Sequence, residues 1–160
     1  MSPAQQQPLR IGVIGSHDCD AAVRQVAHRV GELVAQSGAV LVCGGLGGVM
    51  EAAAEGARGE GGLTVGILPG SDPGAANPGI AIAIPTGLGE ARNSLVVGAS
   101  DAVIAISGGW GTLSEAAFCL KNDVPLITLS SDLPHLPVPS AESAEQAVEF
   151  AVSQGRKRRG

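Results

Sequence analysis

The sequence predicts a single α/β domain, a Rossmann-like three-layer α/β/α sandwich with a mainly parallel sheet of about six strands. The chain has 160 residues, which is the usual length of one domain. Short runs rich in β-branched residues alternate with stretches of helical periodicity, which is the pattern of successive βαβ units. Several of the runs are almost wholly apolar, as strands are when helices cover both faces of a parallel sheet.

The expected strands are the short apolar runs, at residues 9–14, 39–43, 63–68, 80–84, 102–106 and 125–129. The expected helices lie between or after them, at residues 20–37, 49–57, 89–100, 113–122 and 141–153. Gly38 is suited to end the first helix, because a left-handed closing residue is cheapest as glycine. Residues 71–79 and 132–140 are rich in turn-forming residues and are expected to be loops. With aromatic residues at only 2%, the core must be aliphatic.

The domain is expected to span residues 9–153, between a flexible N-terminus at 1–8 and a basic disordered tail at 154–160. The tail carries Arg156, Lys157, Arg158 and Arg159, whereas the rest of the chain has six basic against 15 acidic residues. An acidic body is poorly suited to nucleic acid. The sequence shows no secretory signal and no apolar run long enough to span a bilayer. We therefore expect a cytoplasmic protein with neither a nucleic acid nor a membrane as partner.

Three glycine-rich loops lead from expected strand ends toward helices: Gly15–Asp18, Gly44–Gly48 and Ser107–Thr112. Glycine lets the backbone approach a ligand closely, and the free N–H groups at a helix start favour an anion. The carboxyl ends of parallel strands share one edge of the sheet, so the loops predict one anion-binding cleft. They complete neither the GxGxxG nor the GxxxxGK[ST] motif, and the three scattered cysteines suggest no disulfide framework and no metal site.

Three segments together resemble a known family. Gly108–Glu115 is similar to the GGxGTxxE signature of the LONELY GUY (LOG) family, whose members are often mislabelled lysine decarboxylases. Gly44–Glu51 resembles the family's earlier glycine loop, and Pro85–Asn93 resembles the segment that bears its catalytic arginine. The similarity covers about residues 11–129. Within this superfamily, the short chain and the segment Thr86–Arg92 (TGLGEAR) more closely resemble the molybdenum-cofactor carrier branch.

The resemblance implies roles for individual residues. The family's hydrolases split a nucleoside 5′-monophosphate into a free base and ribose 5-phosphate. Glu115 would stabilise the oxocarbenium-like charge or orient water, and Arg92 would assist the leaving base or hold the substrate. Trp110 would either stack on a ring or contact a second subunit. The residues expected to bind the ligand or its phosphate are Gly15, Ser16, Gly44, Gly45, Gly47, Gly48, Met50, Gly108, Gly109, Trp110, Gly111 and Thr112.

Each candidate also has a purely structural interpretation. Residues 112–115 fit a capping box, in which Glu115 bonds back to the start of its own helix. Arg92, taken alone, would be a solvated surface residue. His17 lies on the first glycine loop, yet a lone histidine is more often structural or solvated. Cys43 is expected to be a buried apolar residue rather than a nucleophile.

The sequence departs from the hydrolases at two places. Their Met-x-x-Arg-Lys is replaced by a frame that ends in Arg92 and Asn93, and their proline before the glycines is replaced by Ser107. We therefore expect a binding protein, a carrier or sensor for a phosphorylated nucleotide-like small molecule such as a molybdopterin-type cofactor. The alternative is a nucleoside 5′-monophosphate phosphoribohydrolase, so the sequence leaves open whether the protein is an enzyme.

The same sequence argues against lysine decarboxylation and against a resident cofactor. Neither Lys121 nor Lys157 lies on a candidate loop, where a pyridoxal Schiff base would need it. No cofactor and no metal are required, and the molybdenum cofactor is a candidate only as a carried ligand. The family resemblance further implies a homo-oligomer, either a dimer or a tetramer.

Overall fold

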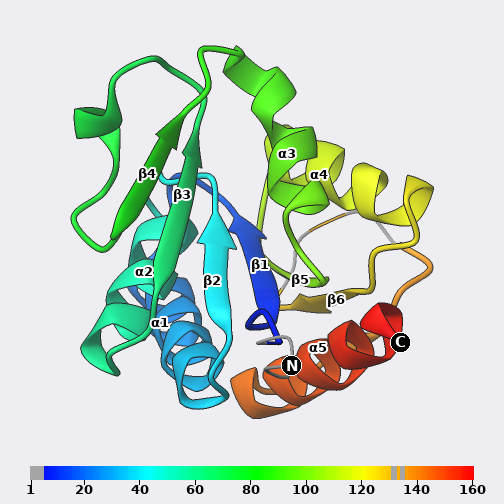
Figure 1. Cartoon of the computed structure of the whole chain (residues 1–160). Coiled ribbons are helices and arrows are strands. Elements are labelled where there is room, and N and C mark those ends of the chain that lie inside the picture. The colour runs from blue at the N-terminus through cyan, green and yellow to red at the C-terminus, as the bar shows by residue number, and fades with distance from the viewer. Residues whose placement is uncertain (1–5, 131–132, 134–135) are drawn as a thin grey trace, which may run out of the picture.

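The computed structural model describes residues 6–130, 133 and 136–160, which form one sheet of seven parallel strands with helices on both faces (Figure 1). The strands are β1 (Arg10–Gly15), β2 (Val40–Cys43), β3 (Thr64–Leu68), β4 (Ile82–Pro85), β5 (Ala102–Ile106), β6 (Leu126–Leu129) and β7 (Ser140–Ala141). The helices are α1 (Ala21–Gln36), α2 (Val49–Gly59), α3 (Asn93–Gly98), α4 (Trp110–Lys121) and α5 (Ala144–Arg159), with 3-10 turns η1 (Pro73–Ala75) and η2 (Gly89–Arg92). None of the described helices combines the length and the apolar character that crossing a membrane requires.

The expected α/β class and parallel sheet are confirmed, but the expected number of strands is wrong, because there are seven and not six. The extra strand, β7, pairs with β6 at only two positions, Thr128 with Ser140 and Leu129 with Ala141. It lies at the end of the segment expected to be a loop. A strand of two residues has no periodicity that a sequence pattern could reveal.

The expected basic disordered tail is also wrong, since α5 continues as far as Arg159. Gly155 is buried against the side chains of Leu9 and Asp101, which holds this part of the helix on the domain. Basic side chains in the last helical turn interact favourably with the negative end of the helix dipole. Of the N-terminus expected to be flexible, residues 1–5 lie outside the described residues.

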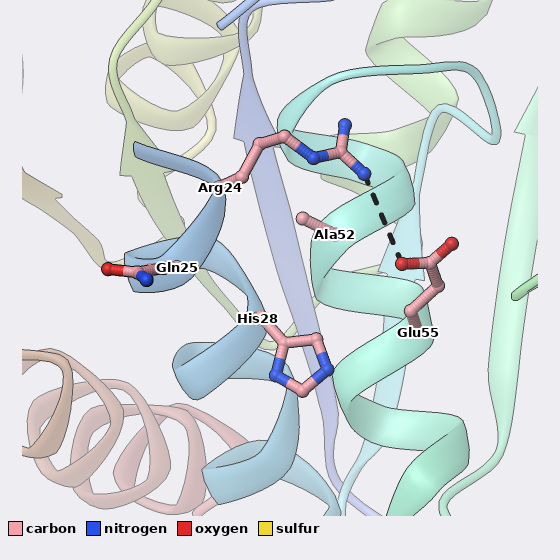
Figure 2. A pocket seen from close by; sticks show the side chains of 5 residues that line it. All are labelled: Arg24, Gln25, His28, Ala52 and Glu55. Atoms are coloured by element: carbon pink, nitrogen blue, oxygen red, sulfur yellow. Dashed lines mark ion pairs between the residues drawn. The ribbon is translucent and has the colours of Figure 1, made fainter. Parts of the chain in front are cut away.

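Two aliphatic cores lie on opposite faces of the sheet. One lies between the sheet and α1, α2 and α5, and the other lies between the sheet and α3 and α4. Helices α1 and α2 pack side by side. Arg24 of α1 forms an ion pair with Glu51 of α2 and a second one, drawn in Figure 2, with Glu55. The three layers agree with the expected sandwich, and Gly38 follows α1 with φ +80°, as its position predicted.

The strand order places a change of direction beside β1. The order across the sheet is β4-β3-β2-β1-β5-β6-β7, so the chain moves outward from β1 to β4 and then returns to add β5 on the other side of β1. In open parallel sheets, ligands bind outside the carboxyl ends of the strands where the order reverses. The topology therefore selects the loops after β1 and β5 as the centre of a site.

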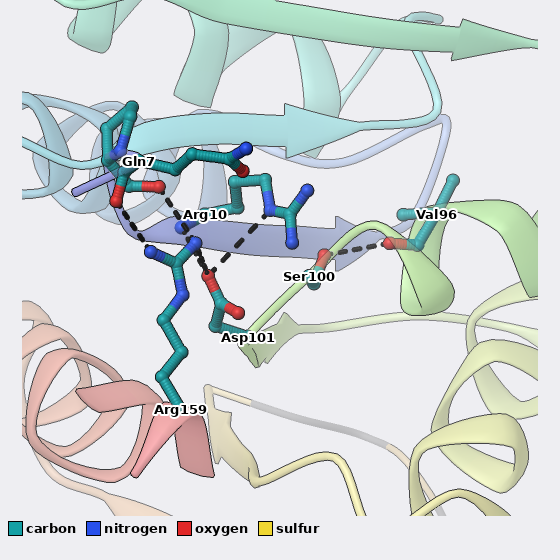
Figure 3. Close-up of polar contacts among 7 residues, drawn as sticks. Gln7, Arg10, Val96, Ser100, Asp101 and Arg159 are labelled. Atoms are coloured by element: carbon teal, nitrogen blue, oxygen red, sulfur yellow. Dashed lines mark hydrogen bonds and ion pairs between the residues drawn. The ribbon is translucent and has the colours of Figure 1, made fainter. Parts of the chain in front are cut away.

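At the opposite edge of the sheet, one buried carboxylate joins the two ends of the chain (Figure 3). Asp101 has a side chain that is only 4% exposed. Its Oδ2 accepts hydrogen bonds from the backbone N–H of Arg10 at 2.8 Å and from Nη2 of Arg159 at 2.6 Å. Arg159 also donates to the carbonyl oxygens of Gln7 and Pro8. The last turn of α5 is thereby fastened to the start of β1.

We predict that Asp101→Asn lowers the free energy of unfolding by about 2 kcal/mol, because it weakens charge-assisted hydrogen bonds to a buried acceptor. Urea unfolding followed by circular dichroism measures this change. Asp123→Asn removes the same charge from an exposed position and serves as the control, with a change of about 0.5 kcal/mol or less. Equal unfolding midpoints for the two variants would contradict the role given to Asp101.

Candidate functional site

A cleft of about 500 Å³ opens at the carboxyl ends of the strands, around the point where the strand order reverses. It is formed by the loops that follow β1, β2, β3 and β5, together with η2. The sequence-predicted residues that line it are Gly15, Ser16, Met50, Arg92, Gly109, Gly111, Thr112 and Glu115. The three glycine loops, which are far apart in the sequence, therefore meet at one cavity.

Six predicted residues do not line this cleft: Gly44, Gly45, Gly47, Gly48, Gly108 and Trp110. The five glycines belong to the loops whose other residues line the cleft. Trp110 is 85% exposed at the first residue of α4, and Leu88, Leu95 and Leu120 are further large apolar side chains that are exposed. Trp110 thus lies outside the cleft lining, and its two expected roles and the expected homo-oligomer stay predictions.

Two other hollows carry less of the chemistry that a ligand needs. The hollow between α1 and α2, of about 260 Å³, includes Arg24 and Glu55, which already pair with each other (Figure 2). A hollow of about 680 Å³ lies at the chain termini and includes Arg159, which already bonds to Asp101. In both hollows these charged groups have partners within the protein.

The first two glycine loops are in direct contact. The N–H of Val49 donates to the carbonyl of Ser16 at 3.0 Å, and the N–H of Gly47 donates to Nδ1 of His17 at 3.1 Å. Gly48 has φ +63°, and a Cβ at this position would lie 2.2 Å from the carbonyl oxygen of His17. Only glycine fits a position that has both a positive φ and no space for a Cβ. His17, expected to be structural or solvated, thus joins the two loops and also lines the cleft.

The third loop enters α4 through an uncommon backbone conformation. Ser107 is buried and has φ +55°, a left-handed value that non-glycine residues rarely adopt. Helix α4 starts at Trp110, three residues before the expected start, and no side chain caps it. Its first N–H groups therefore face the loop without a side-chain acceptor, which is the arrangement that binds anions.

Arg92 is held at the cleft by its neighbours but is not fully paired. It is 8% exposed, its Nη1 donates to Oδ1 of Asn93, and its Nη2 lies 3.5 Å from the carbonyl oxygen of Gly44. Its Nε is buried and has no hydrogen-bond partner among the described residues. Nδ2 of Asn93 in turn donates to Oγ of Ser114 at 3.1 Å. Asn93, noted in the sequence only as a departure from the hydrolases, therefore links Arg92 to α4.

Glu115 is the second buried polar group in the cleft. It is 7% exposed and accepts no hydrogen bond from any residue that the structure describes. Burial raises the pKa of Glu115 from its usual 4.5 to about 7, and the charge of Arg92 offsets this rise only in part. The expected capping box is wrong, because α4 begins at Trp110 and Glu115 is the sixth residue of the helix. An acid with this pKa changes charge near neutral pH.

The remaining lining residues were not predicted as ligand contacts: Asp18, Leu46, Pro69, Glu90 and Asn93. Asp18, Leu46, Glu90 and Asn93 lie within the quoted motifs, so their position there was the available signal. Pro69, which follows β3, lies in none of these motifs and had no such signal. Cys43 is buried as expected, and burial raises its pKa to about 12, so its thiol stays protonated. Within residues 6–130, 133 and 136–160, no group of three or more His, Cys, Asp or Glu side chains could hold a metal ion.

We predict that Glu115→Gln stabilises the free protein at pH 8 and not at pH 4. The carboxyl is neutral in both the folded and the unfolded state at pH 4, so it contributes nothing there. Between its unfolded pKa of 4.5 and its folded pKa of about 7, only the unfolded state loses the proton, so stability falls as pH rises. The loss is on the order of 3 kcal/mol above pH 7.

Urea unfolding of both proteins at pH 4, 6 and 8 measures this effect. The wild-type protein should lose stability across this range relative to the variant. A constant difference between the two proteins would show that Glu115 is not held neutral by burial.

Comparison with known proteins agrees with this architecture. The model of the SLOG cluster4 family matches residues 8–157. An uncharacterized protein of Archaeoglobus fulgidus is 44% identical over 149 residues, which cover 93% of this chain and 98% of the relative. The solved molybdenum cofactor binding protein of Rippkaea orientalis has a TM-score of 0.86 and 40% identity, over 92% of this chain and 98% of that one.

The molybdenum cofactor carrier protein of Chlamydomonas reinhardtii has a TM-score of 0.84 and 30% identity, over 94% of this chain and 99% of that one. The family match extends over nearly the whole described domain, including all three glycine loops. The chain belongs to the SLOG cluster4 family.

Proposed function

We propose that this protein is a carrier that binds a molybdenum cofactor-type ligand, a phosphorylated pterin, in the cleft between the three glycine loops. The observation that carries the proposal is the pair of buried side chains that line the cleft, Arg92 and Glu115. Arg92 Nε has no partner among the described residues, and Glu115 accepts no hydrogen bond from them. A buried polar group without a partner costs about 1–3 kcal/mol, which a bound ligand with matching groups would offset. The similar proteins of Rippkaea orientalis and Chlamydomonas reinhardtii are molybdenum cofactor proteins by name, which supports this ligand class.

The cleft offers separate places for the two ends of such a ligand. Gly109 and Gly111 line it at the uncapped start of α4, where backbone N–H groups and the helix dipole favour a phosphate. Arg92, which is buried and lines the cleft, supplies a positive charge. The arrangement suits a ligand with one anionic end and a polar ring.

The loop before α4 favours a carrier over the hydrolases of the LOG family. Those hydrolases have proline at the position of Ser107, and a prolyl ring holds φ near −65°. Ser107 has φ +55°, so this loop has a backbone that the proline-containing sequence cannot adopt. Asn93, which replaces their lysine, is engaged with both Arg92 and Ser114.

One observation favours the alternative function, hydrolysis of the N-glycosidic bond of a nucleoside 5′-monophosphate. Glu115 has a pKa of about 7, which is the range in which a carboxyl exchanges protons efficiently at neutral pH. Glu115 would accept a proton from water as the water attacks C1′, the base would leave with the electrons of the N-glycosidic bond, and the proton held by Glu115 would pass to the base. Arg92 would hold the substrate.

We predict that the purified protein retains molybdenum cofactor released from a denatured molybdoenzyme. Gel filtration, with molybdenum and oxidised pterin measured in the protein peak, checks this. Arg92→Ala should lower retention at least about tenfold, because a charged donor to the ligand is lost. Arg24→Ala is the matched control, since Arg24 lines the hollow in Figure 2 and pairs with two glutamates, and it should retain as much as wild type. Equal retention by both variants, or no retention by wild type, would refute the carrier function.

A second prediction separates the carrier from the hydrolase. Incubation with adenosine, guanosine, inosine, cytidine and uridine 5′-monophosphates should release no free base, as followed by chromatography. Release that stops in Glu115→Gln would replace the carrier with the phosphoribohydrolase.

A further inference from the structure

We infer that Glu115 and Arg92 bind the ring edge of the ligand and not its phosphate, and that they select a 2-amino-4-oxopyrimidine edge. Pterins and guanine share this edge, which presents an amino group, a ring N–H and a carbonyl oxygen in a row. The inference rests on the proposed function, because it concerns the same cleft. It goes further by assigning the orientation of the ligand and the two residues that determine its specificity.

Glu115 requires hydrogen-bond donors on the ligand. Its carboxyl is buried, lines the cleft and has no hydrogen-bond partner in the described protein. An ionised carboxylate has only acceptor sites, and its two oxygens match two adjacent N–H groups. The amino group and ring N–H of a 2-amino-4-oxopyrimidine are such a pair. A phosphate would meet a like charge at this position.

Arg92 requires a hydrogen-bond acceptor on the ligand. Two of its nitrogens already have protein partners, Nη1 at Asn93 and Nη2 near the carbonyl of Gly44. Each of these terminal nitrogens carries a second N–H, and the buried Nε has no hydrogen-bond partner among the described residues. Because guanidinium has no acceptor, these N–H groups need a ligand oxygen or a lone-pair nitrogen. The ring carbonyl beside the N–H pair supplies it.

The placement along α4 keeps the two ends of the ligand apart. Gly111 lies in the first turn and Glu115 lies four residues later, which is about 6 Å along a helix. The phosphate can therefore bind at the N–H groups of the first turn while the ring reaches Glu115. Arg92 and ionised Glu115 carry opposite charges that nearly cancel, so the ring end of the cleft suits a neutral, polar group.

Ligand binding through an ionised Glu115 should depend on pH. Burial holds the pKa of Glu115 near 7, so binding below pH 7 requires loss of its proton. The groups that face it are Arg92, Cys43 and Cys119, and the other titratable groups that line the cleft are His17, Asp18 and Glu90. A ligand phosphate also titrates near pH 6. The ratio of the affinities for two ligands that carry the same phosphate removes the contribution of phosphate titration.

The test uses three ligands that share ribose and phosphate and differ only in the base. Isothermal titration of the full chain compares guanosine, inosine and adenosine 5′-monophosphates at pH 6 and pH 8. Inosine lacks the amino group, and adenine presents a lone pair where guanine has the ring N–H. We expect guanosine monophosphate to bind about tenfold more tightly than inosine monophosphate at pH 8, and adenosine monophosphate to bind more weakly still. The guanosine preference should shrink at pH 6.

Two glutamine variants locate the preference. Glu115→Gln should bring the affinities for guanosine and inosine monophosphates to within about threefold, because its amide offers one acceptor where the carboxylate offers two. Glu60→Gln removes the same charge from an exposed residue outside the cleft and should keep the wild-type ratio. The comparison of ligands on wild-type protein stands even where a variant does not fold.

Equal affinity for all three nucleotides would overturn the inference and leave the carrier function standing, since the phosphate alone would then be recognised. Retention of molybdenum cofactor without binding of any nucleotide would also overturn it. Failure to retain the cofactor would refute the carrier function itself. Guanosine selectivity that survives in Glu115→Gln would assign recognition to other residues.

Discussion

The cleft depends on how closely the end of β1 approaches the start of α2 and the end of β5. A Cβ on Gly15 would lie 2.2 Å from the carbonyl oxygen of Ile106 and 2.6 Å from Cγ1 of Val49, so no larger residue fits there. This contact lies where the strand order reverses. It allows the loop after β1 to hydrogen-bond with the loop after β2, through Val49 to Ser16 and Gly47 to His17. The glycine loops are thus held by each other before any ligand binds.

A buried carboxylate lies at each end of the strands, and only one of the two is hydrogen-bonded within the described protein. Asp101, at the amino ends of the strands, has its charge satisfied by Arg10 and Arg159 and fastens the termini together. Glu115, at the carboxyl ends, is equally buried and has no donor within the described protein. A group that costs stability in the free protein and lines a cleft is what a binding function requires, because the ligand can supply the missing partners.

The orientation of Arg92 is a property of a network and not of the arginine alone. Asn93 accepts from Arg92 and donates to Ser114, and Ser114 donates to the carbonyl of Gly111. The segment that bears the arginine is therefore tied to the loop proposed to bind phosphate. Such a network restrains both ends of the cleft together, which supports a site built to hold a ligand in one orientation.

The sequence by itself determined the features that neighbouring residues encode. Apolar periodicity predicted the strands closely, with β5 at its observed bounds, and the glycine loops indicated the correct edge of the sheet. The seventh strand was missed because two residues carry no period, and the helical tail was missed because Gly155 is packed by residues from the start of β1 and β5.

Only the tertiary structure decided which groups find partners. The bond between Gly47 and His17 joins residues 30 positions apart, and the contact between Arg92 and Gly44 joins residues 48 positions apart. The same holds for Glu115, whose local pattern fits a helix cap but whose actual place is a buried wall of the cleft. Local patterns reflect backbone preferences over a few residues, whereas hydrogen bonding and burial depend on which distant segments the fold brings together.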